Sequence, residues 1–157
     1  PFFMPYDDKG NRVYPLSQTD SIQHDAAAEE EAEALNIGQG REVIRIHRIR
    51  VLDEQPVINE IVVLPAARFP DFTLDFNKLP NTLYEHYYQQ FGIFVVRATE
   101  SLEAVLPDAL DQKSLRLKAA KPLLEVRRKA FDVEGSVVEF RRSRIDTQRH
   151  HYRIELQ

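Results

Sequence analysis

Two arginines and one glutamate are the residues of this 157-residue chain whose types and spacing best suit the binding of a small charged molecule. Arg48 and Arg50 lie in the β-branched stretch 42–52, at alternate positions after Ile44 and Ile46. Because side chains alternate between the two faces of a strand, both guanidinium groups should continue one buried apolar row. Two neighbouring guanidinium groups repel each other unless an anion or carboxylate joins them, and their forked shape suits carboxylate or phosphate.

Glu60 is the carboxylate that a hairpin can bring to these arginines. The next β-rich segment, 56–64, is predicted to pair with the arginine-bearing strand as an antiparallel hairpin. If residues 53–55 form the loop, Glu60 faces Arg48, whereas a two-residue loop would place it opposite His47 on the other face. The first arrangement would form the floor of a ligand pocket. The alternative is an exposed cross-strand salt bridge, which would contribute little to stability.

Other reactive side chains show no arrangement typical of catalysis or metal binding. The chain has no cysteine, which excludes disulfides, thiolate metal sites and cysteine nucleophiles. The histidines lack metal-site spacing, and His150 and His151 are adjacent, so they point to opposite faces of a strand. Tyr84, Tyr87 and Tyr88 recur at helical spacing, which is typical of core packing, although Tyr84 could donate its hydroxyl into a pocket. We therefore expect no catalytic residue, no metal and no cofactor.

The wider pattern predicts a single α+β domain with a mainly antiparallel sheet. A composition of 43% hydrophobic and 29% charged residues is typical of a globular protein, and the length suits one domain. Hairpins and isolated helices occur without regular βαβ alternation. The predicted helices are 25–36, a turn within 65–70, 82–90 and 107–117, and the predicted strands are 42–52, 56–64, 93–106, 123–132, 137–145 and 152–156. Residues 1–22 carry turn-forming residues and are expected to be irregular.

The charge of the chain is unevenly distributed. The net charge is −4, yet residues 121–157 carry 9 basic and 6 acidic side chains. The basic residues alternate with apolar ones, and an acidic chain gains little attraction to phosphate, so we expect them on exposed strand faces rather than on nucleic acid. No apolar run reaches the roughly 20 residues of a membrane helix, and the first residues show no signal pattern. The expected location is the cytoplasm.

Several blocks, in order along the chain, resemble the UTRA domain, the effector-binding half of HutC-subfamily regulators in the GntR superfamily. The first block, residues 40–60, reads GREVIRIHRIRVLDEQPVINE, and the second, residues 64–70, reads LPAARFP. Later blocks lie at 82–93, 123–143 and 149–156. The resemblance covers about residues 26–157 and leaves residues 1–25 as an irregular N-terminal segment or linker.

The resemblance implies a chorismate-lyase-like α+β fold and a homodimer that senses a small anionic metabolite. It also implies that DNA is bound through a separate N-terminal winged-helix domain, which residues 1–25 are too short to form. The positions that match the ligand pocket of the family are Arg48, Arg50, Glu60, Thr82, Tyr84 and Glu139. These residues are expected to bind the effector, not to catalyse a reaction.

Two departures from the family pattern weigh against a sugar phosphate as the effector. Residues 1–30 contain no Ser/Thr-Phe-Ser loop of the kind that holds phosphate, and Ile145 stands where a tyrosine is often found. Two other functions stay open at this level. One is an enzyme of the same fold that acts on a small carboxylate, with Glu60 or Glu139 as acid or base. The other is a purely structural oligomerisation module.

Overall fold

A six-stranded antiparallel sheet forms the centre of the computed structural model, which describes residues 5–13, 15–73 and 83–156. Its strands are β2 (Leu16–Ala26), β3 (Glu42–Leu52), β4 (Gln55–Pro65), β5 (Val95–Val105), β6 (Leu123–Asp132) and β7 (Val137–Ile145). Their order across the sheet is β2-β3-β4-β7-β6-β5, and every neighbouring pair is antiparallel. Together with the short helices, this sheet confirms the predicted α+β class.

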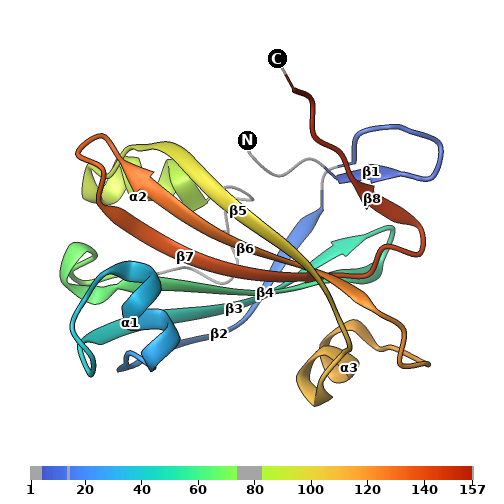
Figure 1. Cartoon of the computed structure of the whole chain (residues 1–157), viewed down its shortest axis with the longest axis horizontal. Coiled ribbons are helices and arrows are strands. Elements are labelled where there is room, and N and C mark those ends of the chain that lie inside the picture. Colours follow the sequence, from blue (N-terminus) through green and yellow to red (C-terminus); the bar gives the residue numbers. More distant parts are fainter. Residues whose placement is uncertain (1–4, 14, 74–82, 157) are drawn as a thin grey trace.

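Short elements cover both faces of the sheet. They are α1 (Glu29–Leu35), the 3-10 turn η1 (Ala66–Arg68), α2 (Leu83–Phe91), α3 (Ala109–Leu115), and a small ribbon of β1 (Pro5–Asp7) and β8 (His150–Tyr152). In Figure 1, α2 and the β1–β8 ribbon lie on one side of the sheet, and α1 and α3 lie on the other. We call these the α2 face and the α1/α3 face. Among the described residues, no helix is long and apolar enough to cross a membrane.

The N-terminal segment is more ordered than the sequence predicts. Residues 16–26 form β2, which pairs with β3 along its length, so the irregular segment expected over 1–25 is wrong for this stretch. Most of β2 is exposed and polar, because it is an edge strand, and its apolar signal is correspondingly weak. Asp25, the first residue of the predicted helix 25–36, instead lies in β2 and accepts a 2.8 Å hydrogen bond from Arg45. The last strand is also displaced, from the predicted 152–156 to 150–152.

The β3–β4 hairpin sets the register of the predicted pocket residues. Its loop consists of two residues, Asp53 and Glu54, both with positive φ, rather than the expected three. The pairing shifts by one residue at Val57, which bulges from β4 without a partner in β3. Beyond the bulge Arg48 faces Glu60, so the predicted pairing is confirmed although the predicted loop is wrong.

Two apolar clusters lie on the α2 face and leave a polar zone between them. The larger cluster packs the strand residues Ile44, Ile46, Val62 and Leu64 against Phe69, Phe72, Leu83 and Tyr87. The smaller one, at the other end of the sheet, contains Leu52, Val57, Ile58, Val126 and Ile145, with Val13 and Tyr152 packed against it. On the opposite face, α1 packs on Val43, Val63 and Phe140. The arginines of β3 therefore follow a buried apolar row, as the alternation of the strand predicts.

Candidate functional site

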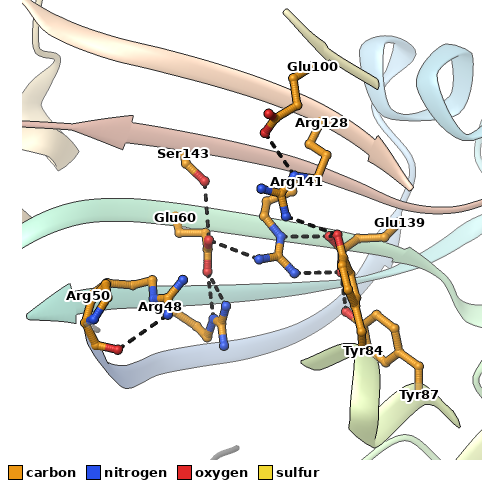
Figure 2. A network of polar contacts seen from close by, with 11 residues as sticks. Arg48, Arg50, Glu60, Tyr84, Tyr87, Glu100, Arg128, Glu139, Arg141 and Ser143 are labelled. Carbon is orange, nitrogen blue, oxygen red and sulfur yellow. Dashed lines mark hydrogen bonds and ion pairs between the residues drawn. The ribbon is translucent and has the colours of Figure 1, made fainter. Parts of the chain in front are cut away.

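A network of buried charges fills the zone between the two apolar clusters of the α2 face (Figure 2). Its arginines are Arg48, Arg50, Arg128 and Arg141, each at most 8% exposed, and its carboxylates are Glu60, Glu100 and Glu139. Four strands, β3, β4, β6 and β7, contribute side chains from the same face, and β5 contributes Glu100. Among the predicted site residues, Thr82 lies outside the described residues.

Arg48 and Glu60 form an ion pair that is closed off from solvent. Arg48 Nε donates to Glu60 Oε2 over 2.7 Å, and Nη2 lies 2.5 Å from the same oxygen. The side chains are 0% and 3% exposed. Arg48 Nη1 is buried and has no hydrogen-bond partner in the part of the chain that the structure describes. A buried donor without a partner is costly, so this nitrogen is suited to an additional acceptor.

The carboxylate of Glu60, in β4, binds side chains from the neighbouring strands β3 and β7. Its Oε1 accepts hydrogen bonds from Arg141 Nη1 at 3.4 Å and from the Ser143 hydroxyl at 3.3 Å. Burial by itself would raise the pKa of Glu60, but the positive charges of Arg48, Arg141 and Arg50 lower that pKa to well below its usual value. Glu60 is therefore ionised at neutral pH and holds the arginines together.

Arg50 continues the row along β3 toward the smaller apolar cluster. Its Nη2 donates to the carbonyl oxygen of Pro15 over 3.4 Å. Burial lowers the pKa of Arg50 to about 10, and the positive charges of Arg48, Arg141 and Arg128 act in the same direction. The charge of Glu60 opposes this shift without cancelling it. An anion placed beside Arg50 would stabilise its charged form, so the side chain is electrostatically suited to a negative ligand.

Glu139 anchors the other end of the network beneath α2. Arg141 binds its carboxylate with two hydrogen bonds, Nε to Oε1 at 2.7 Å and Nη2 to Oε2 at 2.9 Å. The Tyr87 hydroxyl donates to Oε2 over 2.5 Å, and the Tyr84 hydroxyl lies 3.5 Å from Oε1. Burial, together with the negative charge of Glu139, raises the pKa of Tyr87 well above its usual value. Tyr87 therefore remains a donor at any physiological pH.

Arg128 connects the network to the edge strand β5. Its Nε donates to Glu100 over 3.0 Å, and its Nη1 donates to the Tyr84 hydroxyl over 3.2 Å. Glu100 also accepts a hydrogen bond from the hydroxyl of Tyr152 in β8. The ion pair of Arg128 and Glu100 thus contacts both the C-terminal ribbon, through Tyr152, and α2, through Tyr84.

The network as a whole carries an excess of positive charge. Four guanidinium groups face three carboxylates (Figure 2). A cavity of about 10 Å³, enough for about one water molecule, is lined by Ile58, Glu60, Glu100, Val126, Arg128, Arg141 and Ser143. A buried cluster with this charge balance is chemically suited to bind an anion. Among the described residues, no group of histidines and acidic side chains could hold a metal ion.

Several members of the network could not be identified from the sequence. The basic residues of the C-terminal third were expected on exposed strand faces, and this is wrong for Arg128 and Arg141, which are 4% and 7% exposed. The signal for Arg141 is its position two residues after Glu139, which places both side chains on the same face of β7. Among the tyrosines predicted to pack in the core, Tyr87 is buried, Tyr84 is partly buried, and Tyr88 is 60% exposed.

Comparison with known proteins identifies a family and several relatives. The family model of the UTRA domain matches residues 13–151. The HTH-type transcriptional repressor STM4068 of Salmonella typhimurium is 31% identical over 105 residues, which are 67% of this chain and 42% of that repressor. The HTH-type transcriptional repressor PhnF of Mycolicibacterium smegmatis is 29% identical over 112 residues, which are 71% of this chain and 45% of PhnF.

Solved structures show the same architecture. The ligand-binding domain of a GntR-family transcriptional regulator from Bordetella bronchiseptica superposes with a TM-score of 0.90 at 28% identity, over 100% of this chain and 98% of that one. The effector domain of PhnF from Mycobacterium smegmatis gives a TM-score of 0.76 at 27% identity, over 85% and 81% of the two chains. These proteins are domains of transcription regulators rather than enzymes. The chain spans less than half the length of the curated relatives that it matches.

Proposed function

Because this chain belongs to the UTRA domain family, the effector-binding domains of GntR-type transcription regulators, we propose that the charged network of the α2 face binds a small anionic metabolite as its effector. Arg48 and Arg50 would bind the negative group, and Tyr84 would donate a hydroxyl from α2. Glu60 and Glu139 would hold the arginines in position. Thr82, which directly precedes α2, is proposed as a further contact on the strength of its place in the family pattern.

One observation carries this proposal: a buried cluster of arginines outnumbers its carboxylates, and Arg48 Nη1 lacks a hydrogen-bond partner among the described residues. Buried charge without compensation destabilises a folded protein, so a site of this kind is commonly retained for a ligand. Glu60 does not suit acid catalysis, because the surrounding arginines keep its pKa well below the usual value. The electrostatics therefore favour binding over chemistry.

The domain would act as part of a longer regulator. We propose that it forms a homodimer and that effector binding changes the DNA affinity of a separate winged-helix domain, in the cytoplasm where the DNA lies. The names of the relatives STM4068 and PhnF describe repressors, which supports a role in repression for the longer regulator.

A thermal-shift screen tests the effector site. The purified domain is heated with millimolar succinate, citrate, glutamate, inorganic phosphate or glycerol 3-phosphate, because a ligand that binds the folded state raises the melting temperature. We expect at least one of these anions to stabilise the wild-type domain and to have little effect on Arg50→Met. The control is Arg45→Ala, on the same strand but the opposite face, which should keep the full shift. An equal shift in Arg50→Met, or none from any anion, contradicts the proposal.

A further inference from the structure

Two hydroxyl oxygens of β2 are buried and have no hydrogen-bond partner among the described residues. They are Ser17 Oγ and Thr19 Oγ1. β2 is an outer strand of the sheet, and most of its side chains are exposed and polar (Figure 1). A buried hydroxyl that has left water without gaining a hydrogen bond destabilises the folded state. The two oxygens are therefore suited to a partner that the described chain does not provide.

The register of the sheet places both hydroxyls beside the arginine row. Thr19 pairs with Arg48, and Ser17 pairs with Arg50, across β2 and β3. Residues directly opposite each other in an antiparallel pair project to the same face of the sheet, with Cβ atoms about 5 Å apart. Both hydroxyls therefore lie on the α2 face, and the face that carries the charged network extends to β2.

A bulge in β2 ends this polar stretch where the arginine row ends. Asp20 is the extra residue, because the pairing with β3 shifts there. Beyond the bulge, Ile22 pairs with Ile46 and packs against the larger apolar cluster of the α2 face. The change from hydroxyl to apolar side chain in β2 thus matches the change from Arg48 to Ile46 in β3.

We propose that the hydroxyls of Ser17 and Thr19 donate hydrogen bonds to the negative group of the effector, beside Arg48 and Arg50. This inference rests on the proposed function and adds β2 to the effector site. Arg48 Nη1 is a further buried donor that has no partner in the part of the chain the structure describes. One anion between the two strands would accept hydrogen bonds from the hydroxyls and from this nitrogen together.

The set of donors indicates the kind of anion that fits. Two hydroxyls lie opposite two guanidinium groups, and all four side chains can donate to oxygen. A carboxylate has two oxygens with about four lone-pair sites, and a phosphate group has about three strongly accepting oxygens. A compact oxyanion, the chemistry that carboxylate and phosphate share, therefore suits the site. A group with a single acceptor atom would leave some of these donors without a partner.

Removal of the hydroxyls tests the contact. Thr19→Val and Ser17→Ala take away the hydroxyl and keep a side chain of similar size. Isothermal titration calorimetry measures the dissociation constant in a carboxylate arm (succinate, citrate and glutamate) and a phosphate arm (inorganic phosphate and glycerol 3-phosphate). Each variant should raise the dissociation constant about tenfold in the arm that binds, because a hydrogen bond to a charged group is lost. The matched control is Ser21→Ala, on the same strand but opposite His47 on the α1/α3 face, which should bind as the wild type does.

The stability of the variants without any anion separates a binding role from a structural one. Because neither hydroxyl has a partner among the described residues, Thr19→Val and Ser17→Ala should melt at the wild-type temperature or above it. Thr19→Ser keeps the hydroxyl and should keep most of the affinity. A clearly lower melting temperature in both hydroxyl variants, without a change in the dissociation constant, would assign the hydroxyls to the fold and overturn the inference.

The titrations also distinguish failure of this inference from failure of the proposed function. An anion that binds the wild type, Thr19→Val and Ser17→Ala equally well, but does not bind Arg50→Met, overturns the β2 contact alone. Absence of binding to the wild type in both arms overturns the effector site and the β2 contact together. A tenfold loss confined to one arm supports the contact and identifies the negative group as carboxylate or phosphate.

Discussion

Arg48 and Glu60 face each other across β3 and β4 because Val57 bulges from β4 between them and the hairpin loop. If Val57 were paired regularly instead of bulging, the two-residue loop would put Glu60 opposite His47, on the α1/α3 face. The bulge therefore brings a carboxylate to the arginine row of the α2 face, where both side chains are almost completely buried. The pairing has consequences for stability, pH dependence and ligand binding.

Glu60→Gln should strongly destabilise the domain. The substitution leaves Arg48 buried without its counter-charge and replaces one of the two oxygens that accept from Arg48, Arg141 and Ser143 by an amide NH2, which is a donor. Removing one partner of a buried ion pair typically costs about 3–5 kcal/mol in the free energy of unfolding. Urea unfolding followed by circular dichroism measures the change. Glu42→Gln, which breaks only the exposed contact with His24, should cost less than about 1 kcal/mol. Equal losses in the two variants would show that the buried pair has no special role.

The advantage of the wild type over Glu60→Gln should shrink in acid. The arginines lower the pKa of Glu60 from its usual 4.5, so the unfolded chain takes up a proton at a higher pH than the folded one. The stability contributed by Glu60 is thus fully present above about pH 5. It should fall below that pH by about 1.4 kcal/mol per pH unit. Urea unfolding of both proteins between pH 6 and pH 3 measures the difference, and a constant difference over this range would argue against a paired, ionised Glu60.

Tyr87→Phe should destabilise the domain more than Tyr84→Phe does. The Tyr87 hydroxyl is buried and donates to Glu139 over 2.5 Å, whereas the Tyr84 hydroxyl is 3.5 Å from the same carboxylate. A hydrogen bond to a charged group contributes about 1.5–3 kcal/mol, so we expect a loss of that size for Tyr87→Phe. Thermal unfolding of the two variants compares them directly. A larger loss for Tyr84→Phe would mean that its contact with Arg128 matters more than the Glu139 anchor.

Asp111→Ala should loosen α3 without changing anion binding. Asp111 is 1% exposed and accepts hydrogen bonds from Asn59 Nδ2 at 2.8 Å and Arg144 Nη1 at 2.7 Å, both on the α1/α3 face. Its loss leaves Asn59 Nδ2 and the backbone N–H of Asp108 without this acceptor, whereas Arg144 Nη1 keeps Asp108 Oδ2 at 3.2 Å. We expect a cost of about 2–4 kcal/mol. Asp108→Ala, which removes the side-chain cap of the same helix, should cost about 1 kcal/mol. Loss of the anion-induced thermal shift in Asp111→Ala would show that the two faces are coupled.

The sequence predicts the strands that bury an apolar face. β3 has the predicted bounds, 42–52, because its β-branched residues leave no competing pattern. β2 could not be predicted in the same way. Its polar residues pair with β3 at the edge of the sheet, and their conformation depends on backbone partners supplied by β3.

The site is predicted in part. Arg48 and Arg50 could be identified because they continue the apolar row that begins at Ile44. Arg128 and Arg141 could not, since an arginine in a strand is usually exposed and only the sheet order brings β6 and β7 beside β4. Long-range pairing of this kind leaves no local signal in the sequence.

A crystal structure of the domain with the anion that gives the largest thermal shift is the most direct test of the proposed effector site. The account predicts density for the negative group on the α2 face, within hydrogen-bonding distance of Arg48 Nη1 and beside the Arg50 guanidinium. Glu60 and Glu139 should keep their contacts with Arg48 and Arg141. Density for the anion at any other place, with Arg48 and Arg50 unchanged, would contradict it.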